Sequence, residues 1–212
     1  MEPRRLLRNP YFWGLLIGIA GVHLVRPLTR YEPAPPPVLH GVPDFTLSAA
    51  SGEPFRTSDL NGRVYIAAVV STACPGACGR VRDALVKLQR GYQHHGADIC
   101  VLAITATPES DNPAALRRAR DAIAADPERW TWLTGPAPRV EALVRGLFAL
   151  PPDPAGTGDA LLLAEQLAGL VLIDRDGLVR GRYASDELGV DEAFHRSRHV
   201  ASGRGGRKQT RG

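Results

Sequence analysis

The sequence has few of the residues and motifs that mark several large functional classes. It contains three cysteines in 212 residues, too few for a domain of this size to be built on disulfides. It lacks zinc-finger spacing, an RNA-binding aromatic motif and a basic recognition helix, so we expect no nucleic-acid partner. Glycine-rich phosphate loops are also absent, so we expect no nucleotide site. No residue set of a peroxidase or hydrolase is visible.

Charge is unevenly distributed along the chain. The formal net charge is +4, and the excess lies in Arg4, Arg5 and Arg8 at the start and in the arginines and Lys208 after residue 203. The middle of the chain is near neutral and has the periodic pattern of one globular unit with a sizeable core. His195 and His199 share a helix face there, but the arginines around them favour a solvated helix end over a metal site.

An uncharged apolar stretch, residues 11–25, follows the first arginines. As a helix it would be about 22 Å long, which is short for a bilayer core of about 30 Å. Two interpretations are open, an uncleaved membrane anchor and a signal peptide cleaved near Gly18–Ala20. We expect the anchor, because the apolar run continues past that site. The chain would then be a single-pass membrane protein with a cytoplasmic N-terminus and its domain on the exported (periplasmic or extracytoplasmic) side.

The remaining chain divides by composition. Prolines around Pro33–Pro37 favour an extended spacer, and the glycine- and arginine-rich end predicts disorder. The expected organisation is a basic segment at 1–10, an anchor at 11–25, a proline-rich linker at 26–41, a folded domain at 42–198 and a basic tail at 199–212.

Within the domain, buried strands alternate with amphipathic helices. This order predicts an α/β domain with a thioredoxin-like fold, in which helices flank a central mixed sheet. The expected strands lie near 63–71, 97–105, 130–133, 169–174 and 178–183, and the expected helices near 75–93, from 113 onward, 136–148 and 187–198.

Two cysteines, Cys74 and Cys78, lie where the first buried strand meets the following helix. Amide groups at a helix N-terminus stabilise a thiolate, so we expect a lowered pKa for Cys74, with Cys78 one turn further on the same face. Such a pair can close a redox-active disulfide or hold a soft metal ion such as Cu(I), whereas Zn(II) prefers four ligands. A purely structural pair is the alternative. Cys100 lies in an apolar run and is expected to be a core residue.

Several segments together resemble the SCO/SenC family of copper-delivery proteins that serve cytochrome c oxidase assembly. The resemblance covers about residues 42–195, and Thr107 stands where the family usually has an acid. It implies copper as cofactor, Cys74 and Cys78 as metal ligands, and an exported partner such as an oxidase copper subunit. The segments that carry it are Pro43–Leu47 with Gly52, Ser71–Cys78 (STACPGAC), Thr105–Asp111, Trp132–Gly135 and Leu172–Gly177.

The family's third copper ligand is a histidine eight residues before the position of Asp174. In this chain that position is Gln166. His94 and His95 cannot replace the histidine through the same helix, because they would lie about 24 Å from Cys78 along its axis. The resemblance therefore implies Cu(I) rather than Cu(II), with Gln166 at the third-ligand position as a doubtful ligand.

Three functions are consistent with these features. The first is a membrane-anchored copper-binding assembly factor, which is a metallochaperone rather than an enzyme. The second is a thiol–disulfide oxidoreductase acting on exported partner cysteines. The third is a degenerate interaction domain of the same fold.

Overall fold

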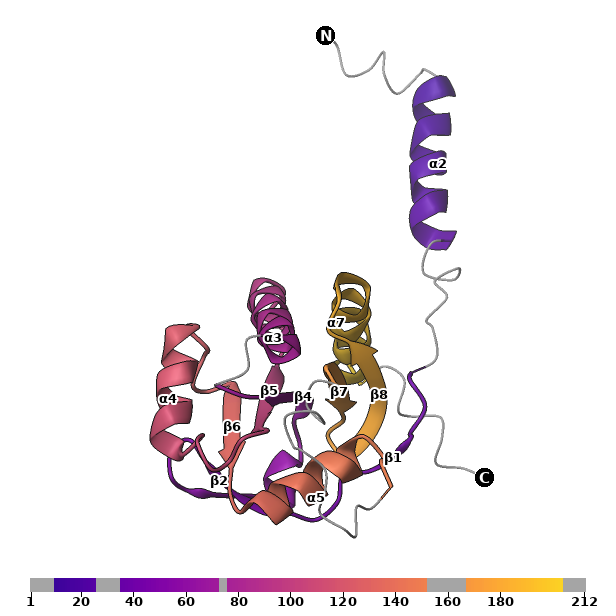
Figure 1. Cartoon of the computed structure of the whole chain (residues 1–212). Coiled ribbons are helices and arrows are strands. Elements are labelled where there is room, and N and C mark those ends of the chain that lie inside the picture. Colours follow the sequence, from indigo (N-terminus) through magenta and orange to yellow (C-terminus); the bar gives the residue numbers. More distant parts are fainter. Residues whose placement is uncertain (1–9, 26–34, 73–75, 152–166, 204–212) are drawn as a thin grey trace, which may run out of the picture. The chain divides into compact units, whose positions relative to one another are not determined.

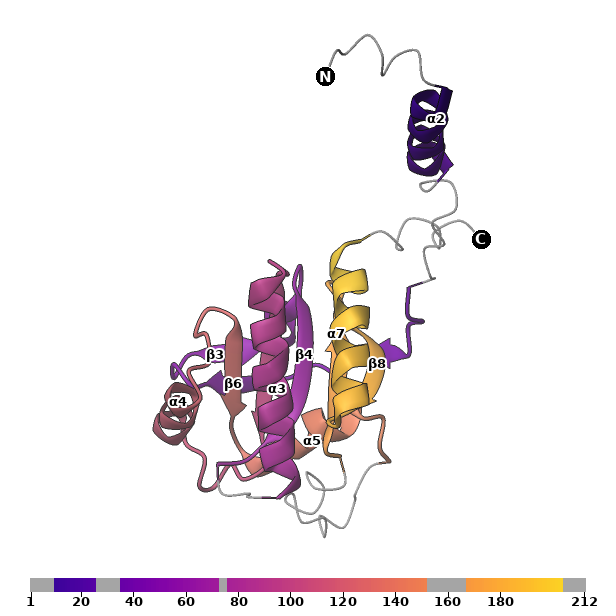
Figure 2. The same cartoon turned by 90° about the horizontal axis from the view of Figure 1, so that it is seen from above.

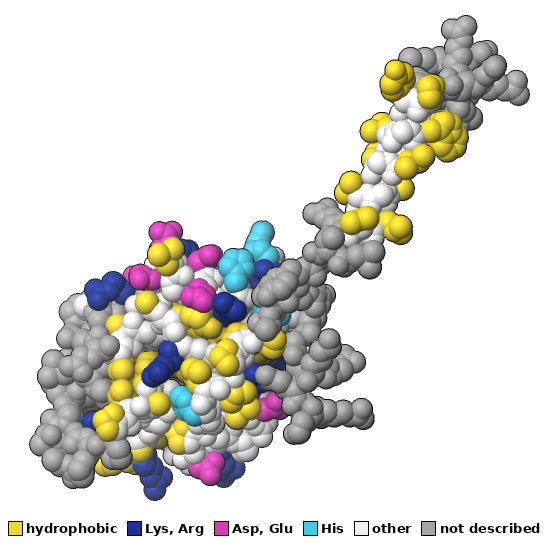
Figure 3. Space-filling model, turned by 90° about the vertical axis from the view of Figure 1, so that its right-hand side faces the viewer, with side chains coloured by type: hydrophobic (Ala, Val, Ile, Leu, Met, Phe, Trp, Pro, Cys, Tyr) yellow, Lys and Arg dark blue, Asp and Glu magenta, His cyan; other side chains and the backbone are white. Residues whose placement is uncertain are grey.

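The computed structural model describes residues 10–25, 35–72, 76–151 and 167–203 (Figure 1). They fall into two compact units, Met1–Ala34 and Pro35–Gly212. In the first unit, helix α2 (Pro10–Val25) buries none of its residues, and hydrophobic side chains line it in Figure 3. Across the described ranges, no helix combines the length and the apolar character needed to cross a bilayer. The spanning anchor expected for residues 11–25 is therefore not supported, since α2 has 16 residues.

The second unit contains a mixed sheet, which confirms the predicted α/β class. In the described part of the chain the order is β1-β8-β7-β4-β5-β6-β2-β3. The neighbouring strands β4, β5 and β6 are parallel, and every other pairing is antiparallel. The strands are β1 (His40–Gly41), β2 (Thr46–Ala49), β3 (Pro54–Arg56), β4 (Val64–Val70), β5 (Ile99–Thr105), β6 (Trp130–Thr134), β7 (Gly169–Ile173) and β8 (Leu178–Ala184).

Helices cover both faces of this sheet. Figures 1 and 2 show α3 and α7 side by side on one face and α5 on the other. Successive side chains of β4 alternate between two hydrophobic clusters, one on each face, and all seven residues of β4 are buried. That double burial explains why the strand has a continuous apolar sequence. The helices are α3 (Ala77–His94), α4 (Pro113–Ala122), α5 (Ala137–Leu147) and α7 (Glu187–Ala201), with a short 3-10 helix η1 (Thr57–Leu60).

Local signals at helix and turn positions act as the sequence predicts. The Asn112 side chain accepts a hydrogen bond from the Ala115 N–H at 3.0 Å, and Pro113 takes the first position of α4. In the β7–β8 hairpin, Asp174 accepts the N–H of Leu178 and pairs with Arg180 Nε at 2.5 Å. These contacts fix the hairpin turn that the sequence predicts.

Residues 35–41, which the sequence assigns to the linker, also belong to this unit, since it starts at Pro35. His40 and Gly41 form β1 against the edge strand β8, and the buried Pro36 accepts a hydrogen bond from Arg180 through its carbonyl. Further on, β2 and β3 form a hairpin, and β2 extends the sheet beyond β6.

Candidate thiol and metal site

The structure describes residues that flank the predicted site, but not the sulfur atoms of its two cysteines. Cys74 and Gln166 lie outside the described residues. Cys78 is the second residue of α3, and its side chain is likewise outside what is described. Ser71 and Thr72 on one side and Gly76 on the other are described. The described residues that flank the cysteine pair, called its frame below, therefore define the site.

The sheet topology determines which segments make that frame. Strands β4 and β5 are parallel, with Val70 opposite Thr105 at their carboxyl ends. The segments that leave these ends, one leading to Cys74 and the other to Asp111, therefore start side by side. This edge of a parallel sheet is where α/β folds commonly place functional residues.

A buried carboxylate joins the two segments. Asp111 is fully buried, and its Oδ2 accepts hydrogen bonds from the hydroxyls of Thr105 at 2.6 Å and Thr107 at 3.0 Å and from the Thr72 N–H at 3.3 Å. Its Oδ1 accepts the Thr72 hydroxyl. Because Thr107 donates its one hydroxyl proton to Asp111, Ser71 must be the donor in the 2.8 Å bond between Ser71 Oγ and Thr107 Oγ1. Asp111 thus ties the segment before Cys74 to the end of β5.

All of these hydrogen-bond partners of Asp111 are neutral. A buried carboxylate without a cation depends on such donors to offset its lost hydration. Thr107 is one of them, at the position where the family usually has an acid. A second carboxylate at residue 107 would face Asp111 and repel it. The threonine therefore fits a network that centres on a single negative charge.

The beginning of α3 gives the site its positive potential. Gly76 is the N-cap residue, and its carbonyl accepts the N–H groups of Gly79 and Arg80 at 3.1 and 3.4 Å. Cys78 lies in the first helical turn, where the helix dipole and exposed amides favour a thiolate. Arg82 follows four residues later in α3.

Cys100 differs from the other two cysteines, as the sequence predicts. It lies in β5 and is 1% exposed within the core cluster that contains α5. Burial raises the pKa of the Cys100 thiol, and the nearby Arg63 opposes that effect only in part. A raised pKa lowers the thiolate fraction at neutral pH, so Cys100 is a packing residue.

The family resemblance singled out the segments that contain Thr72, Thr105 and Asp111, but sequence reasoning assigned these three residues no role in the site. A loop acid and scattered threonines are common in any sequence. One signal was available, because polar residues occur directly at the ends of two neighbouring buried strands.

A CxxxC segment that leads from a central strand into a helix, on a mixed sheet of this kind, defines a class of thiol- or metal-handling domains. Residues 35–202 match the profile of the SCO1/SenC family. The chain belongs to that family. No curated protein matches it.

Solved structures support the same fold. A SCO1/SenC family lipoprotein from Bacillus anthracis is 22% identical with a TM-score of 0.63, covering 76% of this chain and 95% of that one. BsSco, described as a member of the Sco family of cytochrome c oxidase assembly proteins, is 19% identical with a TM-score of 0.66, covering 81% and 99%. Yeast Sco1 with copper bound is 21% identical with a TM-score of 0.58, covering 80% and 98%.

Proposed function

We propose that the chain is a copper-binding assembly factor whose reduced Cys74 and Cys78 hold one Cu(I) and deliver it to the copper site of a respiratory oxidase. The observation that carries this proposal is the frame around the pair. Asp111 holds the segment before Cys74 against the end of β5, and Cys78 lies in the first turn of α3. Family membership supports the choice of cargo, as does the yeast relative described with copper bound.

The donor set fits this cargo. Two thiolates are soft ligands, and Cu(I) accepts a low coordination number. In the described ranges, no group of three or more His, Cys, Asp or Glu side chains is placed to hold a metal ion. The proposal therefore rests on Cys74 and Cys78, with Gln166 at the third position. A neutral amide there is a weaker donor than the family's imidazole, so it would support Cu(II) poorly and leave the two thiolates to hold Cu(I).

A thiol–disulfide oxidoreductase is the second candidate function. Its support is the position of Cys78 in the first turn of α3, where a thiolate is stabilised, together with the disulfide switch described for BsSco. In this role the reduced pair gives two electrons to a partner disulfide and closes its own. Thiol–disulfide exchange needs no third metal ligand, so Gln166 would not impair this function.

Two measurements on the full-length reduced protein separate these candidates. Anaerobic titration with Cu(I) against a competing chelator should give one tightly bound equivalent. The reduction potential of the pair should be high enough for the dithiol to persist in the presence of that copper. Loss of tight Cu(I) binding, with a readily exchanging disulfide, would favour the oxidoreductase.

We also propose that the domain works next to a membrane on its exported side. The support is helix α2, whose apolar residues are exposed, including Leu15, Ile17 and Leu24 at 65%, 69% and 75%. Apolar surface on this scale is usually covered by lipid or by a partner. The full-length protein should sediment with membranes and resist extraction by high salt, and release by salt alone would contradict this.

A further inference from the structure

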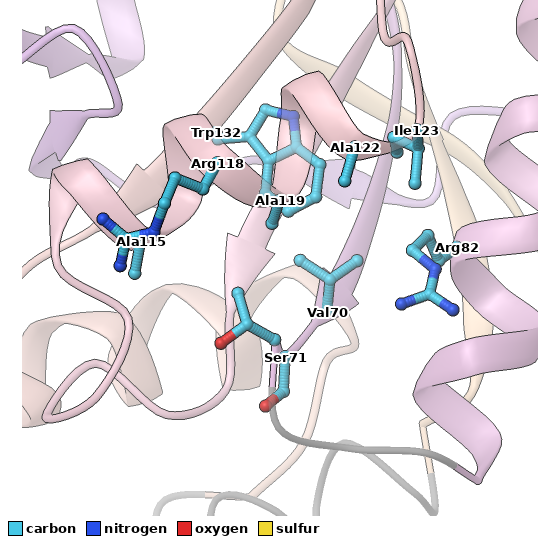
Figure 4. Close-up of a pocket in the computed structure, with 10 residues that line it drawn as sticks. Val70, Ser71, Arg82, Ala115, Arg118, Ala119, Ala122, Ile123 and Trp132 are labelled. Atoms are coloured by element: carbon cyan, nitrogen blue, oxygen red, sulfur yellow. The ribbon is translucent and has the colours of Figure 1, made fainter.

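A groove runs between α3 and α4 from the segment that precedes Cys74. Its first hollow, of about 350 Å³, is lined at the end of β4 by Val70, Ser71 and Thr72 (Figure 4). The second hollow, of about 730 Å³, shares Ala122 and Ile123 with the first and continues along α3. The α3 side chains of the groove recur at positions 82, 86 and 90. Two turns of helix make this stripe about 12 Å long, which accommodates three to four residues of an extended peptide.

The groove has an apolar floor because α4 presents small residues to it. Ala115, Ala119 and Ala122 leave the space between the two helices open. Trp132 forms part of the wall, and its buried indole N–H has no hydrogen-bond partner.

The rim of the groove is basic. Figure 4 shows Arg82 on one side of the first hollow and Arg118 on the other. Lys87 and Arg90 line the second hollow, where Asp83 is the one acidic lining residue. Among the residues that the structure describes, Arg118 and Arg90 form no ion pair. Arg82 pairs with Asp83 at 3.9 Å and Lys87 with Glu187 at 3.7 Å, and all four of these side chains are exposed. Positive charge is therefore available to an incoming carboxylate.

The groove residues are close to the cysteine pair along the sequence. Thr72 lies two residues before Cys74, a distance of at most about 7 Å along the backbone. Arg82 follows Cys78 by four residues in α3. A partner whose metal-binding or disulfide cysteines meet the pair would place its flanking residues in the groove.

We propose that this α3–α4 groove docks an extended acidic segment of the partner protein, which flanks the partner's own cysteines. The proposal rests on the proposed thiol chemistry and specifies the partner surface that goes with it. Charge complementarity selects the occupant, since Arg90 and Arg118 have no ion pair among the described residues, the pairs of Arg82 and Lys87 are exposed, and the floor accepts apolar side chains between the carboxylates.

The test is thiol–disulfide exchange between the reduced full-length protein and short peptides carrying a CxxxC disulfide. One peptide has four flanking Asp and Glu residues, and its match has Asn and Gln instead. In the exchange the protein dithiol attacks the peptide disulfide through a mixed disulfide, ending as protein disulfide and peptide dithiol. At low salt the acidic peptide should react about fivefold faster, because exposed charge pairs contribute modestly each.

Paired variants locate the preference. The double variant Arg90→Gln/Arg118→Gln should remove the acidic preference and leave the rate with the neutral peptide unchanged. The control Arg56→Gln/Arg139→Gln, at exposed positions outside the groove, has the same net charge and should keep the preference. Equal rates for the two peptides with the wild type, or loss of the preference in the control alone, would overturn the docking proposal.

Two further measurements separate a failure of the proposed thiol chemistry from recognition of lipid by the groove. Neutral 2,2′-dithiodipyridine reports whether the cysteine pair reacts at all, and no reaction with it or with either peptide would overturn the proposed function and the docking with it. Vesicles containing phosphatidylglycerol report binding to an anionic membrane. If the groove variant loses vesicle binding while the wild type shows no peptide preference, the groove recognises lipid and the proposal is wrong.

Discussion

Replacing Asp111 with asparagine would remove the charge from the buried carboxylate while keeping its shape. In the wild type, Oδ2 accepts hydrogen bonds from the hydroxyls of Thr105 and Thr107 and from the Thr72 N–H. The amide oxygen of the asparagine can accept the same three hydrogen bonds. The amide NH₂ would take the place of Oδ1, and the Thr72 hydroxyl can turn to accept from it. The geometry therefore survives, and the change tests the contribution of the charge.

The expected cost follows from these contacts. A hydrogen bond to a charged acceptor contributes about 1.5–3 kcal/mol, against about 0.5–1.5 kcal/mol for a neutral one. Weakening three hydrogen bonds would lower the free energy of unfolding by about 3 kcal/mol. Part of this loss is offset because burying a neutral amide costs less than burying a charged carboxylate. We expect Asp111→Asn to lower the free energy of unfolding by about 1–3 kcal/mol, and Asp111→Ala by about 3–5 kcal/mol because its donors lose their acceptor.

Equilibrium urea unfolding measures this loss, and the reduction potential of the cysteine pair gives a second readout. A purely structural role would change stability alone. If Asp111 positions the segment before Cys74, the potential should move as well. The exposed Asp98 supplies the matched control, and Asp98→Asn should change stability by less than about 0.5 kcal/mol. An Asp111→Asn protein as stable as this control, with an unchanged potential, would refute the reasoning.

Three further predictions concern other parts of the domain. Native alkylation after reduction should label Cys74 and spare Cys100, whose pKa is raised by burial; equal labelling rates would show that Cys100 is accessible. Gln166→His should add an imidazole donor and give stable Cu(II) binding with a visible thiolate-to-copper band; an unchanged spectrum would place residue 166 away from the copper. Burial raises the pKa of Tyr92, whose hydroxyl forms a 2.8 Å hydrogen bond with Ser197. The neutral Tyr92 hydroxyl therefore contributes fully to the free energy of unfolding below the pKa of about 10 that tyrosine has in the unfolded chain, and this contribution is lost as the pH rises above 10. Tyr92→Phe should therefore cost about 1 kcal/mol at pH 8 and reduce the loss of stability between pH 8 and pH 11; a difference independent of pH would contradict the assignment.

The sequence predicts most of the domain's elements because their signals are local. Strand β4 reads as a continuous apolar run since it is buried on both faces, and Asn112 with Pro113 marks the start of α4. The two-residue strand β1 has no such signal. His40 and Gly41 become a strand only because β8 presents an edge to them.

The site is predictable in part for the same reason. Cys74 and Cys78 stand out by spacing and by their place between a strand and a helix. The role of Asp111 depends on β4 and β5 being parallel neighbours, which brings Thr72 to a carboxylate 39 residues away. Pairings at that separation are set by the topology of the sheet and leave no periodic trace in the sequence.

Copper K-edge X-ray absorption of the Cu(I)-loaded full-length protein tests the central claim most directly. Two sulfur scatterers in the wild type, together with loss of tight copper binding in Cys74→Ser and in Cys78→Ser, are the predicted result. A copper site dominated by nitrogen or oxygen scatterers, or one that persists in both serine variants, would contradict the assignment of copper to this cysteine pair.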